Sequence, residues 1–153
     1  MGNRRKGREF ALQILFEIEF SHEKLKQALE SFWKENAAAP DIMVFTEELV
    51  SGTLRNASEI DAIIEGSSTN WKLSRMASVD RNLLRQAAFE LLYIKDIPAS
   101  VTINEAVEIA KKFGTVESSS FINGILDKIA KEKGGVSEQS GFAGCERGGP
   151  GAM

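Results

Sequence analysis

Residues 78–92 have the sequence SVDRNLLRQAAFELL, which contains the strongest helical pattern in the chain. Hydrophobic residues recur there at intervals of three and four, so one broad face of a helix is apolar. We expect Ser78 to cap the start of this helix, and Asp96-Ile97-Pro98 to interrupt it, because proline lacks an amide donor and restricts the preceding residue. The segment is predicted to be the main helix of the core. Its apolar face consists of Val79, Leu83, Leu84, Ala87, Ala88, Leu91 and Leu92.

Helical spacing continues on both sides of this segment. Before it, a hydroxyl cap is expected at Ser21, and four amphipathic stretches could form one half of a bundle. After it, two more stretches flank a serine-rich loop, and no alternating run is long enough for a strand. We predict an all-α fold, a compact bundle of about seven helices in two small subdomains. The other expected helices are centred on residues 4–20, 25–33, 42–54, 60–64, 103–113 and 121–129.

The length of the chain and its C-terminal composition define its domains. A chain of 153 residues with 42% hydrophobic residues suits one compact core. We assign residues 1–133 to a helical domain. Residues 134–153 contain seven glycines and little apolar periodicity, so we expect a disordered tail. Cys145 lies in that tail and is interpreted as an incidental thiol, so the fold cannot depend on an intramolecular disulfide.

The sequence gives no indication of membrane insertion or export. Its longest apolar runs, such as residues 91–94, are far below the roughly 20 residues needed to cross a bilayer. The basic start is followed by amphipathic sequence containing Glu9, and a signal peptide would have an apolar core there. We therefore expect a cytoplasmic protein without a membrane partner.

Motifs for catalysis, metals and cofactors are missing from the sequence. The single histidine, His22, cannot build a multi-histidine metal site and is interpreted as a solvated residue. The glycines before the tail are scattered singly, so there is no phosphate-binding loop and no nucleophile elbow. We therefore expect no enzyme activity, no cofactor and no metal.

Charge is distributed unevenly along the chain, whose net charge is −3. Residues 1–8 carry four cations and no acid, at the start of a helix whose dipole also attracts anions. This cluster predicts a polyanion site, although charge alone does not separate RNA from DNA, from anionic lipid or from a merely solubilising terminus. Residues 41–65 are strongly acidic and could receive a basic protein. The four cations are Arg4, Arg5, Lys6 and Arg8, of which Arg4 and Arg8 share a helix face.

Several motifs resemble the NusB family in both order and spacing. The basic opening is followed by Val79-Asp80-Arg81 and Leu84-Arg85, then by Glu90-Leu91-Leu92 and Ile97-Pro98. The most specific motifs are Ile103-Asn104-Glu105-Ala106-Val107-Glu108-Ile109-Ala110-Lys111 and Phe121-Ile122-Asn123-Gly124-Ile125-Leu126-Asp127. The resemblance covers about residues 3–133 and excludes the tail.

This resemblance implies a seven-helix transcription antitermination factor. Such a factor joins the ribosomal protein NusE to bind boxA RNA of nascent ribosomal transcripts, and it works in an elongation complex with other Nus factors. The resemblance places Asp80 toward NusE. It also implies an RNA surface, formed by Arg4, Arg5, Lys6, Arg8, Lys112, the loop from Gly114 to Ser120 with Ser118 and Ser119, and Phe121.

Some motif residues also have structural interpretations. Thr102 and Glu105 have the spacing of a capping box, and Gly124 inside a helix suggests close helix packing. Phe121 suits core packing as well as base stacking. Two alternative functions are a domain of a ribosomal RNA methyltransferase, for which the chain lacks the length and the catalytic cysteines, and a helical interaction protein whose basic end meets lipid or protein.

Overall fold

The computed structural model describes residues 2–68 and 72–134, which are almost entirely helical. The predicted all-α class is confirmed, and no strand occurs within these two ranges. Residues 135–153, including Cys145, lie outside them, so the predicted disorder of the tail stays a prediction. The helices are α1 (Gly2–Ser21), α2 (Leu25–Glu35), α3 (Pro40–Arg55), α4 (Ala57–Ser67), the 3-10 turn η1 (Leu73–Arg75), α5 (Ser78–Tyr93), α6 (Ala99–Phe113), α7 (Ser118–Ile129) and the π-helical turn η2 (Ala130–Gly134).

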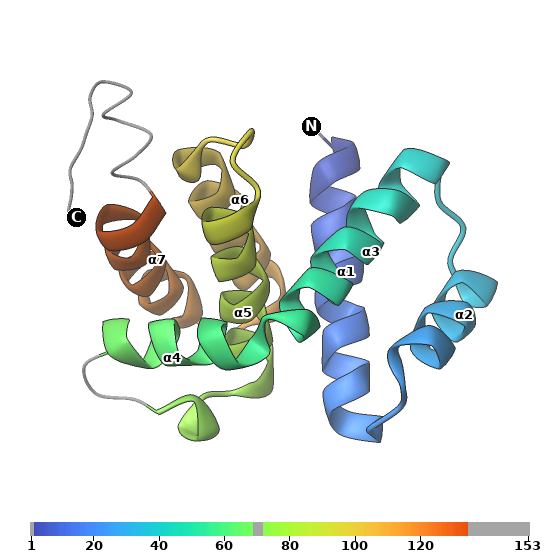
Figure 1. The fold of residues 1–153 in the computed structure, drawn as a ribbon, viewed down its shortest axis with the longest axis horizontal. Helices are drawn as coiled ribbons and strands as arrows, with labels where there is room; N and C mark the ends of the chain where they lie inside the picture. The colour runs from blue at the N-terminus through green and yellow to red at the C-terminus, as the bar shows by residue number, and fades with distance from the viewer. Residues whose placement is uncertain (1, 69–71, 135–153) are drawn as a thin grey trace.

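Helix α5 is the centre of the fold. It packs against α1, α3, α4, α6 and α7. Figure 1 shows α1, α2 and α3 on one side of the molecule and α4 to α7 on the other. The expectation that the first four helices form one half is therefore wrong for α4, which packs mainly on α5 and α7. The physical reason is the position of its apolar face, since Ile60 and Ile64 are both fully buried on the α5 side of the molecule.

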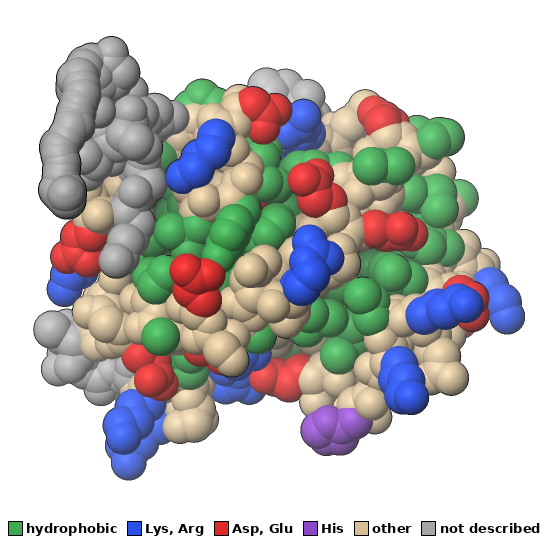
Figure 2. All heavy atoms as spheres, viewed as in Figure 1, with side chains coloured by type: hydrophobic (Ala, Val, Ile, Leu, Met, Phe, Trp, Pro, Cys, Tyr) green, Lys and Arg blue, Asp and Glu red, His purple; other side chains and the backbone are tan. Residues whose placement is uncertain are grey.

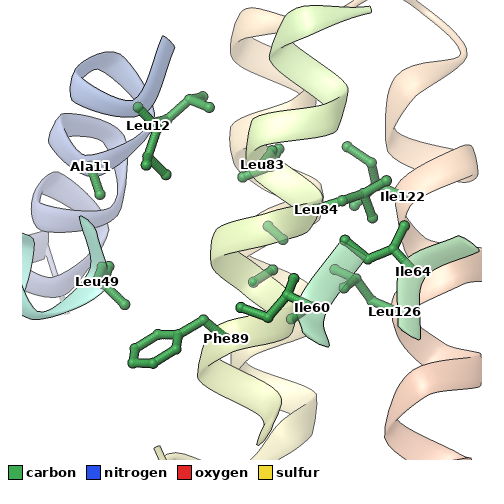
Figure 3. Packing of buried hydrophobic residues seen from close by; sticks show 14 of the residues in the cluster. Ala11, Leu12, Leu49, Ile60, Ile64, Leu83, Leu84, Phe89, Ile122 and Leu126 are labelled. Carbon is green, nitrogen blue, oxygen red and sulfur yellow. The ribbon is translucent and has the colours of Figure 1, made fainter. Parts of the chain in front are cut away.

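The core follows the apolar face predicted for α5. Leu83 and Leu84 are fully buried, and the remaining members of that face are buried or partly buried. Figure 3 shows Leu84 near Ile122 and Leu126 of α7. One continuous hydrophobic cluster includes residues from all seven α-helices, so the two groups of helices share a single core.

Two glycines allow helices to approach one another closely. A Cβ at Gly52 would lie 2.1 Å from the ring of Phe89, and one at Gly7 would lie 2.9 Å from the ring of Phe45. Side chains at these positions would therefore separate α3 from α5 and from α1. At Gly124, in contrast, an added Cβ would meet nothing within 4 Å, so the close packing expected there is wrong.

The side-chain caps expected from the sequence are wrong. Ser21 ends α1, and α2 begins after Lys24; α5 begins after Ala77, and α6 begins after Pro98. None of these helix starts has a side-chain cap hydrogen bond. The hydroxyls of Ser78 and Thr102 donate to acidic side chains on other helices. Tertiary contacts have replaced the local role that sequence spacing suggested.

Candidate nucleic-acid interface

Arg4 and Lys6, at the start of α1, are exposed cations that rest on aromatic rings. The Cζ atom of Arg4 lies 4.8 Å from the centre of the Phe45 ring, and Nζ of Lys6 lies 5.0 Å from that of Phe10. Within residues 2–68 and 72–134, neither cation pairs with a carboxylate. A ring supports a cation without neutralising its charge. Both charges therefore remain available to an anionic ligand.

Arg5 is paired to a carboxylate on α6. Its Nε and Nη2 donate to the two carboxylate oxygens of Glu105 at 2.7 and 2.8 Å. These hydrogen bonds raise the pKa of Arg5 and lower the pKa of Glu105. The side chain of Arg5 is nevertheless 42% exposed, so part of the guanidinium faces solvent.

The structure corrects the prediction that Arg8 is part of the RNA surface, because its side chain is only 4% exposed. Nε and Nη2 donate to both oxygens of Glu90, each at 2.9 Å, and Thr102 donates a further hydrogen bond to that carboxylate. The amide of Gln86 donates to the backbone carbonyl of Arg8 at 2.9 Å. A buried guanidinium held in this way joins α1 to α5 and has no surface to offer RNA.

Lys112, near the end of α6, lies against α1. Its Nζ donates to Glu9 at 3.1 Å, while its side chain is 59% exposed. Together with the Arg5 to Glu105 pair, this contact links the first turns of α1 to α6 at two points. The structure thus brings Lys112 close to the first turns of α1, and its contact with RNA stays a prediction.

The expectation of a serine-rich loop is wrong, because Ser118, Ser119 and Ser120 form the first turn of α7 and the loop from α6 is residues 114–117. Two of these serines have different roles. Ser118 is buried, and its hydroxyl accepts a hydrogen bond from the backbone N–H of Thr115 at 2.9 Å. Its prediction as a surface residue is therefore wrong, because it closes the loop. Ser119 is partly exposed and lines a shallow groove between α6 and α7 with Asn104 and Asn123.

Phe121 and Asp80 lie on the same cavity, which has a volume of about 240 Å³. Phe121 packs partly against the core, and part of its surface remains accessible. One carboxylate oxygen of Asp80 is buried without a hydrogen-bond partner in the described part of the chain. A buried acceptor without a donor is costly, so a donor from a ligand would be favoured here. The cavity is lined by Arg75, Met76, Ala77, Asp80, Thr115, Glu117, Ser118 and Phe121.

A second ion-pair network joins the other end of α1 to α5. Arg81 donates to both oxygens of Glu19 at 2.9 Å and also to the backbone carbonyls of Leu73 and Met76. Ser78 donates to the same carboxylate. The hydrogen bonds from Arg81 are the main reason that the pKa of Glu19 is lowered to about 2. This network holds η1 in place beside Asp80.

Sequence reasoning missed three residues that shape this surface, namely Phe45, Glu9 and Glu105. The sequence pattern gave no sign of a surface role for Phe45, and the spacing of Glu105 suggested a helix cap. The contact between Arg5 and Glu105 spans 100 residues of sequence, so no local spacing could reveal it. A four-residue spacing between Arg5 and Glu9 was the only local signal, and Glu9 pairs with Lys112 instead.

Figure 2 shows Lys and Arg side chains spread over the viewed face among acidic and hydrophobic ones, without a single large basic field.

His22 is exposed between α1 and α2, with a φ of 62°. Among residues 2–68 and 72–134, no group of three His, Cys, Asp or Glu side chains is arranged to hold a metal ion. No described helix is both long and apolar enough to cross a membrane. The first turns of α1, with Lys112 and the Asp80 cavity, remain the candidate site.

Comparisons with known proteins identify the family of this chain. The model of the NusB family matches residues 5–131. A transcription antitermination protein NusB from Myxococcus xanthus is 50% identical over 134 residues, covering 85% of this chain and 96% of that protein. Its counterpart from Desulfitobacterium hafniense is 52% identical over 132 residues, covering 84% and 88%.

Solved structures show the same relationship. NusB of T. maritima is 42% identical, has a TM-score of 0.83, and the match covers 90% of this chain and 96% of that one. A crystal structure of antitermination factors NusB and NusE in complex with dsRNA has a matching chain that is 27% identical, with a TM-score of 0.79 and coverage of 86% and 98%. On this evidence, the chain belongs to the NusB family.

Proposed function

We propose that this protein is a transcription antitermination factor that binds boxA-type RNA of nascent ribosomal transcripts together with NusE. In this role it promotes processive ribosomal RNA transcription, in the cytoplasm, within an elongation complex that contains other Nus factors. The relatives named above are transcription antitermination proteins, and one solved relative is in a complex of NusB and NusE with dsRNA. The role calls for binding surfaces and no catalytic group.

The observation that carries the proposal is the exposed first turn of α1. Arg4 and Lys6 keep their charge on aromatic supports, as phosphate recognition requires. Arg5 and Lys112 add cations beside them, although each is partly compensated by a carboxylate. We assign the RNA backbone to these four side chains and assign Arg8 to the fold.

Bases of the RNA have two candidate contacts beyond the cations. Ser119 lies on the groove between α6 and α7, with two asparagine side chains that can donate and accept hydrogen bonds. Phe121 offers part of an aromatic surface to an unstacked base, which is the usual mode of single-stranded RNA recognition. These residues lie on the side of α6 and α7, so we place the RNA path from α1 across the end of α6.

NusE is assigned to the surface around Asp80. The buried, unpartnered oxygen of this carboxylate favours a donor such as a guanidinium or ammonium group from a basic protein. Because Phe121 opens onto the same cavity, RNA and NusE would meet there. A shared boundary of this kind accounts for cooperative binding of the two partners.

The proposal is tested by measuring RNA binding with and without NusE. Fluorescence anisotropy with a boxA-like RNA, a scrambled RNA of equal composition and anionic lipid vesicles separates the candidate ligands. We expect preference for the boxA-like RNA, a steep loss of affinity with added salt, and tighter binding when NusE is present. Equal affinity for both RNAs with NusE present, or a preference for the vesicles, would refute the proposal.

A further inference from the structure

The carboxylate of Glu105 holds Arg5 in the way that a phosphate would hold it. Two nearly parallel hydrogen bonds of 2.7 and 2.8 Å join the guanidinium to the two oxygens. Arginine binds carboxylates and phosphates through this same fork. Glu105 therefore occupies the edge of Arg5 that is best suited to an RNA phosphate.

The pair between Arg5 and Glu105 is one of several contacts that hold α1, whose apolar residues are buried in the core. Arg8 attaches the same helix to α5 through Glu90, and both of those side chains are almost completely buried. Arg5 is 42% exposed, and its pair with Glu105 lies at the edge of the protein. Nη1 of Arg8 also lies 3.7 Å from Oε1 of Glu105, a longer contact than either hydrogen bond from Arg5. Arg5 can thus exchange partners while the buried pair keeps the helices together.

We infer that Glu105 competes with RNA phosphate for Arg5 and so sets the RNA affinity of the site. This inference rests on the proposed function. In the free protein, Arg4 and Lys6 are ready for phosphate, while Arg5 must first leave its carboxylate. Contact between Arg5 and RNA is therefore an exchange of one anion for another.

The exchange has a consequence for salt dependence. When a free cation meets a phosphate, the counterion condensed on the RNA is released, and each such contact steepens the salt dependence. When Arg5 leaves Glu105, the exposed carboxylate attracts a cation from solution, which offsets that release. The wild-type protein should therefore show weaker binding and a shallower salt dependence than a protein with the carboxylate removed.

The experiment compares the wild-type protein with Glu105→Gln and with the matched control Glu108→Gln. Each variant removes one negative charge from α6, at positions three residues apart. Glu108 pairs with Lys111 and makes no hydrogen bond to Arg5. A boxA-like RNA is titrated at several salt concentrations. Glu105→Gln should raise affinity at low salt about threefold or more, and steepen the slope of log K against log salt by about 0.7. Glu108→Gln should change affinity by less than about twofold.

A second pair of proteins shows whether the effect acts through Arg5. The gain from Glu105→Gln should fall to the size of the Glu108→Gln effect when Arg5 is already alanine, because no fork remains to be released. Thermal unfolding followed by circular dichroism checks that each variant retains its helices. A full gain in the Arg5→Ala background would mean general electrostatic repulsion and would overturn the inference.

Other results also separate this inference from the proposed function. Equal effects of the two glutamine variants, or weaker binding by Glu105→Gln, would overturn the proposed competition between Glu105 and RNA phosphate. Neither result would argue against RNA binding itself. The latter result would mean that Glu105 orients Arg5 for RNA. Failure of every variant and of the wild-type protein to bind any RNA would refute the proposed function, and the inference with it.

Discussion

Arg4 and Arg8 lie one helical turn apart on the same face of α1, yet they belong to different regions of the molecule. Both guanidinium groups face the ring of Phe45, at 4.8 and 5.5 Å. Arg4 is exposed and has no carboxylate partner among the described residues. Arg8 is buried and bound through two hydrogen bonds to Glu90. One arginine is available to a ligand, and the other is part of the core.

The difference shows that residue type and helical position do not determine the role of a cation. Burial removes water from Arg8, so its charge is stable only with a paired carboxylate and well-placed hydrogen bonds. Arg4 keeps its water and needs no such partner. The outer turn of α1 should therefore affect ligands, whereas the inner turn should affect folding.

The largest effect is expected for Arg8→Ala. Removing one member of a buried pair leaves the carboxylate of Glu90 uncompensated, which should lower the free energy of unfolding by about 3–5 kcal/mol. Arg4→Ala is the matched control and should change it by less than about 0.5 kcal/mol. Chemical denaturation measures both. Equal midpoints for the two variants would remove the distinction between the turns.

The next effect concerns Asp80. Its side chain lines a cavity open to a ligand, as the outer turn of α1 is, but one of its oxygens is buried, as Arg8 is. Asp80→Lys should weaken NusE association by about 2 kcal/mol, roughly 30-fold, through the lost pair and the new repulsion. Binding of RNA alone should change much less, and the gain in RNA affinity on adding NusE should shrink.

Calorimetric titration with NusE tests this prediction, with Asp96→Lys, an exposed acid beyond the opposite end of α5, as the control for equal charge reversal. Stability is measured in parallel, since Asp80 also lies in the first turn of α5, where an acid is worth about 0.3–1 kcal/mol. Unchanged NusE affinity in a folded Asp80→Lys protein would place the partner elsewhere.

A smaller effect is expected from replacing both Arg4 and Lys6 with alanine. RNA affinity at moderate salt should fall by about 1–2 kcal/mol, roughly tenfold, and the salt slope should become shallower by about 1.4 for two lost contacts. The helix content should remain, because neither side chain is buried. Replacement of Lys24 and Lys26, two exposed lysines outside the site, removes the same charge as a control. A loss of equal size in that control would show a general charge effect.

The smallest effect is expected at the other end of α1, where Glu19 is only partly exposed and paired with Arg81. Its pKa is about 2 in the folded protein against an ordinary value of 4.5. A lowered carboxyl pKa gives stability that is fully present above pH 4.5 and is lost as the pH falls toward 2. Between these values, the stability difference between wild type and Glu19→Gln should shrink by about 1 kcal/mol. A difference that stays constant from pH 5 to pH 2.5 would contradict this assignment.

Much of the fold was predictable from the sequence, because helical periodicity reports directly on burial. The apolar face of residues 78–92 correctly identified the main core helix, and helical spacing also identified the helices before and after it. These features depend on local patterns or on family motifs.

The features that sequence could not predict depend on contacts between distant residues. Ser78 and Thr102 have the chemistry of helix caps, but carboxylates from α1 and α5 accept their hydroxyl hydrogens. Nothing near Arg8 in the sequence indicates Glu90, which is 82 residues away. A helical wheel places Arg4 and Arg8 together, and only the packing of α5 against α1 makes them different.

The different burial of Arg4 and Arg8 has a consequence for how this family would change over evolutionary time. A descendant that no longer bound RNA would be free to lose Arg4, whereas the loss of Arg8 would strand Glu90 in the interior. Arginine would then be retained at the position of Arg8 and replaced at the position of Arg4. Under the proposed function, retention of Arg4 in a distant homologue would indicate that RNA recognition is retained, whereas retention of Arg8 would indicate only that the fold is retained.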